Sequence, residues 1–327
     1  MSRMTIAQAF LAGITEEMRR DERVFVMGEE VGEWGVYGLT QTLERDFGPA
    51  RVRRTPISEA GFVGAAVGAA MRGMRPVVEL MYIDFIGVCM DQIINQAAKM
   101  RYMTGGQAYV PMVLFAPTGC GRRNAGQHSQ SLESLLTHIP GLKVIAPVTP
   151  ADAKGMYKTA IRDDDPVVVL MGKQTYNLEG EVPDEEYCIP FGSASLRREG
   201  KDVTIIAWSR QVEYALTAAE KLAAGGVSAE VIDLRSLVPL DFDTIAASVR
   251  KTGRVVIAEE CVKRGGYGSE IAAQIAEELF LCLKAPVRRV GALNIVPPYS
   301  PPLEDAFFPH PADIEAAAME IIVKREA

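Results

Sequence analysis

Short apolar runs alternate with longer helical patterns along most of this chain. In the first half we expect strands at residues 24–27, 76–81, 112–116, 143–146 and 166–171. Helical patterns lie between them at 39–46, 59–72, 84–101 and 151–161. Because strands that are apolar throughout are buried on both faces, this alternation predicts a parallel sheet covered by helices.

The alternation stops at residues 173–192 and then resumes. This segment is polar, contains two prolines and shows no clear period, which is typical of a linker. The second half predicts strands at 203–208, 229–234, 255–259 and 287–290, and helices at 212–224, 242–251, 269–284 and 311–324. We therefore expect an α/β fold of two α/β domains, at 1–175 and 195–327, with a linker at 176–194; a chain of 327 residues is long enough for two.

Charge and hydropathy disfavour several classes of function. The chain has 35 Lys and Arg against 42 Asp and Glu, a net charge of −7, and no run of five basic residues, so we expect no nucleic-acid partner. The longest nearly unbroken apolar stretch, 62–71, is too short to span a membrane. Residues 6–14 resemble an amphipathic helix rather than a secretory signal, because Gln8 interrupts them and Glu16 follows soon after.

The cysteines indicate a reducing compartment. All five are widely spaced, and no Cys-x-x-Cys pair occurs, so neither a zinc site nor a disulfide framework is suggested. They are Cys89, Cys120, Cys188, Cys261 and Cys282. We expect a cytoplasmic protein with free thiols.

Glycine is unusually frequent in the predicted helix 59–72. Gly61, Gly64 and Gly68 each cost about 1 kcal/mol there relative to alanine, so a compensating close contact is expected. Tight packing inside the domain and a helix–helix contact between subunits both remain open. The spacing is not the dinucleotide-binding fingerprint, because these glycines lie inside the helix and not in the turn before it.

Four segments carry the residues with the clearest chemistry. They are Gly-Glu-Glu-Val at 28–31, Thr-Pro-Ile-Ser-Glu-Ala-Gly-Phe at 55–62, Glu-Leu-Met-Tyr-Ile-Asp-Phe at 79–85 and Gly-Gln-His-Ser-Gln-Ser at 126–131. The first three lie at the carboxyl ends of predicted strands, where open α/β sheets bind ligands. Together the four segments resemble the β subunit of thiamine-diphosphate-dependent 2-oxo acid dehydrogenases, a family that includes the pyruvate, branched-chain 2-oxo acid and acetoin dehydrogenases.

The resemblance covers nearly the whole chain and implies both a fold and an activity. The implied architecture is transketolase-like, with a pyrimidine-binding domain followed by a transketolase C-terminal domain. The implied reaction is thiamine-dependent cleavage beside a 2-oxo carbonyl, with transfer of the acyl group to the lipoamide of an acyltransferase partner. The form of the segment at 79–85 favours the acetoin or pyruvate type. Two alternatives are half of a split transketolase-like enzyme that moves ketol groups between sugars, and a scaffold that lost the chemistry; the intact Glu59, Phe85 and His128 argue against the scaffold.

Glu59 is the first candidate catalytic residue. Thiamine catalysis requires the aminopyrimidine of the cofactor to become its iminotautomer, and a carboxyl group hydrogen-bonded to the pyrimidine ring favours that change. The resemblance gives this role to the glutamate of Pro-Ile-Ser-Glu, which is Glu59. In the competing structural interpretation Ser58 caps a helix and Glu59 favours its dipole.

The resemblance also implies the remaining site residues. His128 lies in a polar loop and is expected to line the active site near the substrate and the lipoyl group. Phe85 and Tyr82 offer an aromatic face for the aminopyrimidine, with core packing as the alternative. Further cofactor contacts are expected from Glu29, Ile57 and Met81.

A potassium site is implied near the turn at 160–165. The corresponding ligands are backbone carbonyls and an acidic side chain contributed by Met112, Ala160, Ile161, Asp163 and Asp165. Relatives often have asparagine in place of Asp165, which leaves the ligand set open. A solvated turn that ends a helix is the alternative.

Two features concern partners. Thiamine enzymes usually bind the cofactor diphosphate through magnesium held by a Gly-Asp-Gly motif, and this chain contains no Asp-Gly pair. We therefore expect an α subunit to supply the magnesium site, in an assembly of two α and two β chains. The loop before His128 contains Arg122 and Arg123 where relatives have small residues; contact with an anionic substrate, contact with a neighbouring subunit and plain solvation all remain open.

Overall fold

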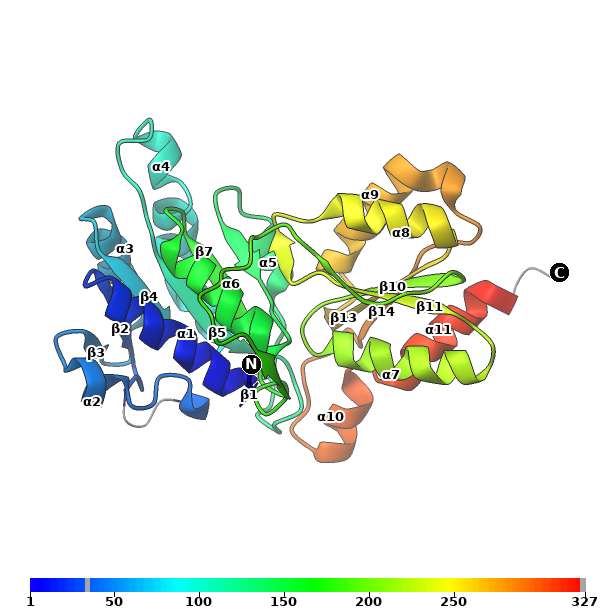
Figure 1. The fold of residues 1–327 in the computed structure, drawn as a ribbon, viewed down its shortest axis with the longest axis horizontal. Coiled ribbons are helices and arrows are strands. Elements are labelled where there is room, and N and C mark those ends of the chain that lie inside the picture. Colours follow the sequence, from blue (N-terminus) through cyan, green and yellow to red (C-terminus); the bar gives the residue numbers. More distant parts are fainter. Residues whose placement is uncertain (33–35, 324–327) are drawn as a thin grey trace. The chain divides into compact units, whose positions relative to one another are not determined.

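The computed structural model describes residues 1–32 and 36–323, which divide into two compact units (Figure 1). Unit 1 comprises Met1–Thr118 and Leu135–Phe191, and unit 2 comprises Gly119–Ser134 and the chain from Gly192 onward. This division differs from the expected boundaries in two places. The segment 119–134, which carries His128, belongs to unit 2, and residues 176–191 of the expected linker belong to unit 1.

Unit 1 contains a parallel sheet whose strands lie in the order β6-β7-β5-β4-β2-β3. These strands are β2 (Val24–Gly28), β3 (Val52–Arg54), β4 (Arg75–Glu79), β5 (Val113–Thr118), β6 (Lys143–Ile145) and β7 (Val167–Gly172). The helices are α1 (Ile6–Arg20), η1 (Val36–Gly38), α2 (Leu43–Phe47), α3 (Glu59–Met71), η2 (Ile83–Cys89), the π-helix η3 (Gln92–Ala97), α4 (Met100–Met103), α5 (Glu133–Thr137) and α6 (Pro150–Arg162). The chain passes from unit 2 back to unit 1 within α5.

Unit 2 contains a sheet in the order β14-β13-β10-β11-β9, parallel except for the antiparallel β9. The strands of this sheet are β9 (Ser195–Arg198), β10 (Val203–Ala207), β11 (Ala229–Asp233), β13 (Val255–Val262) and β14 (Arg288–Ala292), and the short β12 (Ser236–Val238) is not part of it. The helices are α7 (Gln211–Ala224), α8 (Phe242–Thr252), α9 (Tyr267–Leu279), η4 (Phe280–Cys282), α10 (Pro301–Phe307) and α11 (Pro311–Val323). Figure 1 shows α7 and α11 on one face of this sheet and α8 and α9 on the other, so the expected α/β fold is confirmed.

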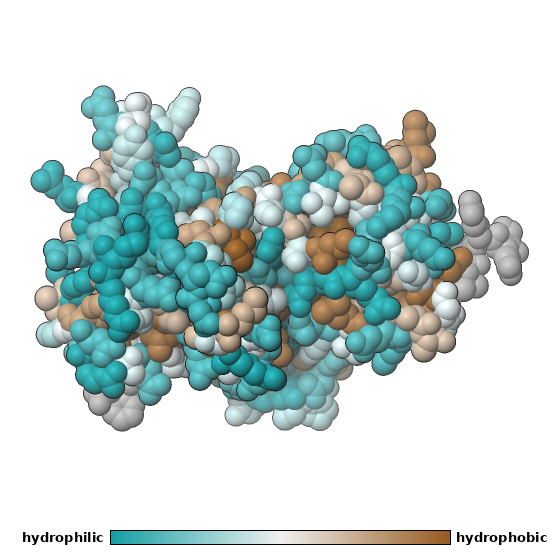
Figure 2. Space-filling view, viewed as in Figure 1, coloured by the Kyte–Doolittle hydropathy of each residue, from teal (hydrophilic) through white to brown (hydrophobic). Residues whose placement is uncertain are grey.

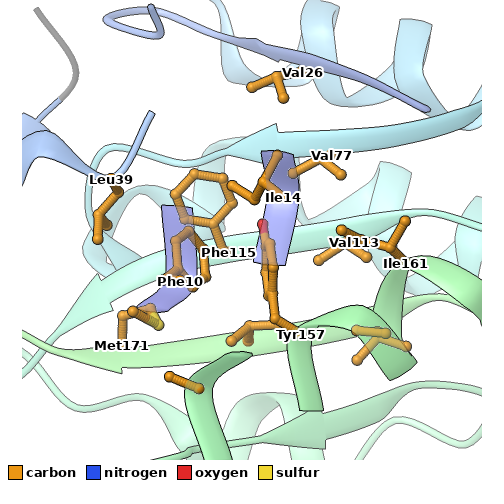
Figure 3. Packing of buried hydrophobic residues seen from close by; sticks show 14 of the residues in the cluster. Phe10, Ile14, Val26, Leu39, Val77, Val113, Phe115, Tyr157, Ile161 and Met171 are labelled. Atoms are coloured by element: carbon orange, nitrogen blue, oxygen red, sulfur yellow. The ribbon is translucent and has the colours of Figure 1, made fainter. Parts of the chain in front are cut away.

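The core of unit 1 forms where α1 and α6 pack against the sheet. Thr5 begins α1 with a reciprocal cap, in which the Gln8 amide donates to Thr5 Oγ1 at 3.2 Å and the Thr5 amide donates to Gln8 Oε1 at 2.9 Å. The ring of Phe10 in α1 then packs at a tilt against Tyr157 of α6 and edge to face against Phe115 of β5, at ring-centroid distances of 3.9 and 5.0 Å (Figure 3). All three rings are fully buried, so they fix α1 and α6 relative to the strands.

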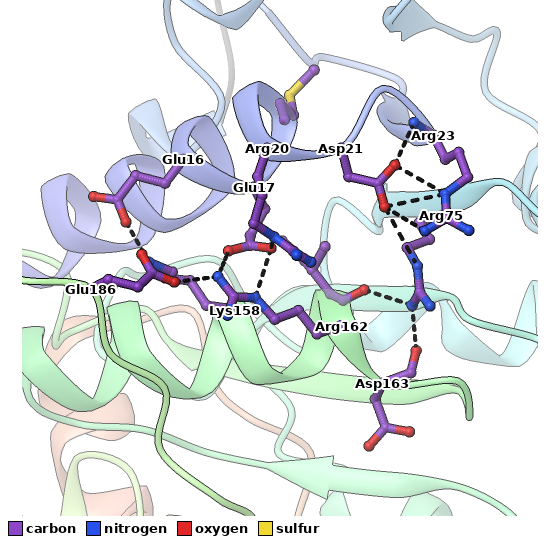
Figure 4. Close-up of polar contacts among 12 residues, drawn as sticks. Glu16, Glu17, Arg20, Asp21, Arg23, Arg75, Lys158, Arg162, Asp163 and Glu186 are labelled. Atoms are coloured by element: carbon purple, nitrogen blue, oxygen red, sulfur yellow. Dashed lines mark hydrogen bonds and ion pairs between the residues drawn. The ribbon is translucent and has the colours of Figure 1, made fainter.

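An ion-pair network joins the polar sides of the same two helices (Figure 4). Lys158 of α6 has a fully buried side chain and bonds Glu16 and Glu186 at 2.6 Å each. Arg162 bonds Glu17, whose side chain is 1% exposed, at 2.5 Å. Because each buried charge has an opposite partner, the network holds α1, α6 and the segment after β8 together without an uncompensated charge.

Three local expectations differ from the structure. The predicted linker contains β8 (Glu179–Val182), which pairs antiparallel with β1 (Ser2–Thr5), a contact between the two ends of unit 1 that no local pattern shows. The predicted helix 84–101 is broken into η2, η3 and α4, since the amide of Ala98 donates to the carbonyl of Ile93 and widens one turn. The predicted helix 39–46 shortens to α2 because Thr42 adopts a φ of 75°.

The last predicted helix ends at Lys324, which lies outside the described residues, and α11 extends to Val323. In the described ranges no helix has both the length and the apolar character that crossing a membrane requires. Figure 2 shows a face covered mainly by hydrophilic residues, with hydrophobic ones in small separate patches.

Candidate active site

Two glutamates lie close together at the carboxyl ends of the strands in unit 1. Glu29 follows β2, and Glu59 is the first residue of α3 and only 7% exposed. Burial and the negative charges of Glu59 and Glu30 raise the pKa of Glu29 above its ordinary value. The two carboxylates therefore lie near enough for the charge of Glu59 to act on Glu29.

Ser58 does not act as a side-chain cap for α3. It stands at the N-cap position, but its hydroxyl accepts no hydrogen bond from the first turn. A Cβ atom on Gly61 would lie 2.9 Å from Ser58 Oγ, so the hydroxyl lies close over this glycine. The capping interpretation of Ser58 is therefore wrong, and Glu59 begins the helix as a buried acid.

An aromatic group borders the same site. Tyr82 and Phe85 are both half-buried, and their rings meet edge to face with centroids 5.8 Å apart. Tyr37 donates its hydroxyl to the Tyr82 hydroxyl at 3.4 Å, and the buried Lys173 ammonium lies 5.1 Å from the centre of the Tyr82 ring. Tyr37 and Lys173 are site residues that the sequence did not reveal, since each lies 45 or more positions away from Tyr82.

The remaining expected cofactor contacts differ in exposure. Ile57 is 83% exposed, and Met81 is half-buried. Whether an aminopyrimidine fits this site can be judged from the polar atoms that the site leaves without a partner. Among the described residues, Glu29 Oε1, Thr55 Oγ1 and Gln92 Oε1 are buried without a hydrogen-bond partner. Because unpaired buried polar atoms are rare, these acceptors fit a ligand rich in N–H groups, and thiamine diphosphate is compatible with the site.

A third glutamate, Glu79, is buried in the sheet next to Gly28 and Glu29. Glu79 ends β4 with no exposed surface, and neither carboxylate oxygen has a partner among the described residues. Burial first, and then the charges of Glu29 and Glu30, raise the pKa of Glu79 to about 8. Glu79 is therefore largely protonated at neutral pH and adds no negative charge behind Glu29.

The turn expected to bind potassium is occupied by the chain's own cations. Arg75 Nη1 donates to the carbonyls of Ile161 and Asp163 at 3.0 and 2.8 Å (Figure 4). Lys143 bonds both Asp163 and Asp165, and Arg101 Nη1 lies 2.6 Å from Asp165 Oδ1. The carbonyls of Met112 and Ala160 each accept a backbone amide. As it stands, this arrangement does not fit a potassium ion, because side-chain cations already pair with oxygens of Ile161, Asp163 and Asp165.

His128 lies in unit 2, in the loop between β5 and α5. It is half-buried, and its amide donates to the carbonyl of Ala125 at 3.3 Å. Residues of this loop line a cavity of about 410 Å³, together with the strand end at Glu260–Val262, the segment at 294–297 and Phe307. The loop therefore borders a hollow lined by both polar and apolar residues.

Arg123 of this loop forms ion pairs with acidic side chains of the same chain. Its guanidinium bonds Glu304 at 2.5 Å and Asp305 at 2.8 Å, and it is neither a plain solvated charge nor a free receptor for an anionic substrate. Arg122 is exposed.

Comparison with known proteins defines the class to which this fold and site belong. The chain matches the transketolase pyrimidine binding domain over residues 2–179 and the transketolase C-terminal domain over residues 192–314. It is also similar to a solved structure described as a split gene transketolase, inactive beta4 tetramer, with a TM-score of 0.81, 25% identity and 98% of each chain covered.

Curated relatives narrow the class. The chain is 49% identical to acetoin:2,6-dichlorophenolindophenol oxidoreductase subunit beta of Cupriavidus necator over 97% of this chain and 96% of the relative. It is 48% identical to the mitochondrial pyruvate dehydrogenase E1 component subunit beta-1 of Arabidopsis thaliana, over 96% and 88%. It is 44% identical to the 2-oxoisovalerate dehydrogenase subunit beta of Bacillus subtilis, over 98% and 99%. The chain belongs to the family of β subunits of thiamine-dependent acetoin and 2-oxo acid dehydrogenases, as its site motifs indicate.

Proposed function

We propose that this chain is the β subunit of an acetoin or pyruvate dehydrogenase that transfers the acyl group to a lipoyl-bearing acyltransferase. The observation that carries the proposal is the buried Glu59 beside Glu29, in a site with unpaired buried acceptors. A carboxyl group held this way exchanges a proton with a bound ring nitrogen instead of with water.

Each site residue then has a defined task. Glu59 bonds the pyrimidine ring nitrogen through its carboxyl group. Glu29 is a second carboxyl group near Glu59. Phe85 and Tyr82 provide the stacking face, and Ile57 and Met81 provide apolar contacts beside it. When bound, thiamine diphosphate supplies the carbon nucleophile that attacks the substrate carbonyl and accepts the electrons of the broken bond. His128 orients the substrate and the incoming lipoyl group by hydrogen bonding.

An α subunit is expected to complete the site. The sequence has no Gly-Asp-Gly motif, and within 1–32 and 36–323 no cluster of three or more His, Cys, Asp or Glu side chains is arranged to hold a metal ion. A magnesium diphosphate therefore needs ligands from another chain. Gly61, Ala65 and Gly68 are exposed on one side of α3, and Gly68 has open space where a side chain would be, so this helix offers a backbone surface to a second subunit. Two α and two β chains form the simplest closed assembly.

Reconstitution tests the proposal. The purified chain alone should bind thiamine diphosphate weakly in calorimetry with magnesium present, and it should not reduce 2,6-dichlorophenolindophenol. After addition of the α subunit, both cofactor binding and dye reduction with acetoin or pyruvate should appear. Tight magnesium-dependent binding by this chain alone contradicts a shared site. Comparison of acetoin, pyruvate and 2-oxoisovalerate in the same assay identifies the substrate.

A split transketolase-like ketol transferase is the second candidate, and its supporting observation is the structural similarity to a split gene transketolase. This enzyme would move a two-carbon ketol group between sugar phosphates without a lipoyl protein. Turnover of xylulose 5-phosphate with ribose 5-phosphate by the reconstituted enzyme, together with no response to the three dehydrogenase substrates, would favour it.

We infer a cytoplasmic location, which is consistent with five cysteines that form no disulfide in the structure. Potassium binding would require the Arg75 guanidinium to move away from the carbonyls of Ile161 and Asp163. For the expected domains at 1–175 and 195–327, we propose that limited proteolysis cuts near residues 192–194, so that the first fragment also keeps residues 176–191.

A further inference from the structure

The loop that carries His128 has an unfavourable backbone conformation. Arg123 and Ala125 have φ values of 59° and 62°, in the left-handed region that non-glycine residues seldom adopt. The carbonyl of Ala125 accepts the amide hydrogen of His128, so the strained turn leads directly to this histidine. Such residues keep this conformation only where surrounding contacts hold them in it.

Glu304 of α10 supplies these contacts. Its side chain is fully buried, and its carboxylate accepts the Gly121 amide at 3.0 Å and the Arg123 amide at 3.3 Å. Arg123 also places Nη1 2.5 Å from Glu304 Oε2 and 3.2 Å from the carbonyl of Pro301. A buried carboxylate with two backbone donors and a guanidinium is well compensated, so its burial and the loop conformation depend on each other.

The two ends of the loop are fixed independently of Glu304. The Cys120 amide donates to Glu260 Oε1 at 2.5 Å, and Arg210 pairs with the same oxygen at 2.5 Å. The Gly119 amide donates to the carbonyl of Gln130 at 3.0 Å and closes the loop. Because the ends are held elsewhere, loss of the Glu304 contacts should free the middle of the loop, including His128, without unfolding unit 2.

We propose that Glu304 is a positioning residue for His128 and acts through Arg123 and the left-handed turn at 123–125. The proposal depends on the proposed function only for the task given to His128. The held turn fixes the direction in which the imidazole leaves the loop.

The first test does not involve catalysis. In the purified full chain, Arg123→Met should speed amide exchange in peptides covering 119–134 about tenfold, whereas peptides of unit 1 stay unchanged. The chain has only three histidines, so histidine-selective labelling resolves each ring by NMR. The His128 signal should move, and the His138 signal, in unit 1, should stay in place. Arg288→Met, which breaks a half-exposed ion pair with Glu320 elsewhere in unit 2, is the matched control and should change neither readout.

The second test uses the enzyme reconstituted with its α subunit. Arg123→Met should lower turnover by about 10- to 100-fold, and Arg123→Lys should recover most of it, because the ammonium still pairs with Glu304. On a His128→Gln background, Arg123→Met should have little further effect, which is the signature of action through His128. Unchanged exchange in 119–134, or full additivity of the two substitutions, would overturn the proposal. An enzyme without activity toward any substrate would count against the proposed function, and the exchange and NMR results would still decide this inference.

Discussion

Gly28 and Glu79 are in direct contact at the ends of the paired strands β2 and β4. A Cβ atom on Gly28 would lie 2.9 Å from both the Cβ and the backbone oxygen of Glu79, so only glycine fits at this position. Glu29 follows Gly28 at once, and its charge helps to raise the pKa of Glu79. The contact therefore links Glu29, a candidate cofactor contact, to the buried carboxyl group of Glu79.

Glu79 should make stability depend on pH. Its folded-state pKa of about 8 lies above the ordinary value of 4.5, so the neutral form favours folding. The stabilisation is complete below pH 4.5 and is lost as the pH rises through 8, by at most about 5 kcal/mol. Urea unfolding from pH 5 to 8.5 should show this loss in the wild type and a flatter profile for Glu79→Gln, with the variant the more stable protein at pH 8.5. The exposed Glu278→Gln on α9 is the control. Parallel profiles for wild type and Glu79→Gln would contradict a protonated Glu79.

Glu59→Gln should keep the fold and remove the proton that the cofactor needs. In the reconstituted enzyme, hydrogen–deuterium exchange at the thiazolium carbon should slow by about 10²-fold or more. Circular dichroism checks the fold. Glu30→Gln, at an exposed position in the same segment, should change exchange only slightly. Exchange at the wild-type rate in Glu59→Gln would remove Glu59 from its assigned role.

Arg75 should decide how the turn at 160–165 responds to potassium. In the wild-type chain, replacing NaCl by KCl at constant ionic strength should leave the thermal unfolding midpoint unchanged, since Arg75 occupies two of the carbonyls. Arg75→Met frees these oxygens and should make the midpoint higher in KCl than in NaCl. A thermal unfolding midpoint that is higher in KCl than in NaCl for the wild type would show that potassium displaces the Arg75 guanidinium, which contradicts this prediction.

The thiols should react in an order set by burial. Cys188 is exposed, whereas Cys89, Cys120 and Cys261 are buried, and burial raises the pKa of Cys89 to about 12. Titration of the native protein with Ellman's reagent should show a fast phase that Cys188→Ser removes. Unfolding in urea without reductant should raise the count to five. A count of three or fewer in freshly purified protein would contradict free thiols.

The site could be predicted from the sequence to the extent that it consists of local motifs. Pro-Ile-Ser-Glu places Glu59 at the start of a helix after a strand, and the structure has α3 beginning there. Tyr82 and Phe85 lie close in sequence and in space. The roles of Tyr37, Lys173 and Glu79 were not visible, because their partners come from other strands and loops.

The alternation of the main strands and helices was determined by the sequence itself. Apolar periodicity acts between neighbours in the chain, and it correctly predicted β2, β4, β5, α3 and α6 within a few residues. Tertiary structure decided the contacts that join distant segments. The pairing of β1 with β8, the place of loop 119–134 in unit 2 and the bond from Arg123 to Glu304 each connect residues far apart in sequence. Such contacts depend on which surfaces meet after the chain has collapsed, and residue order alone does not contain that information in a locally readable form.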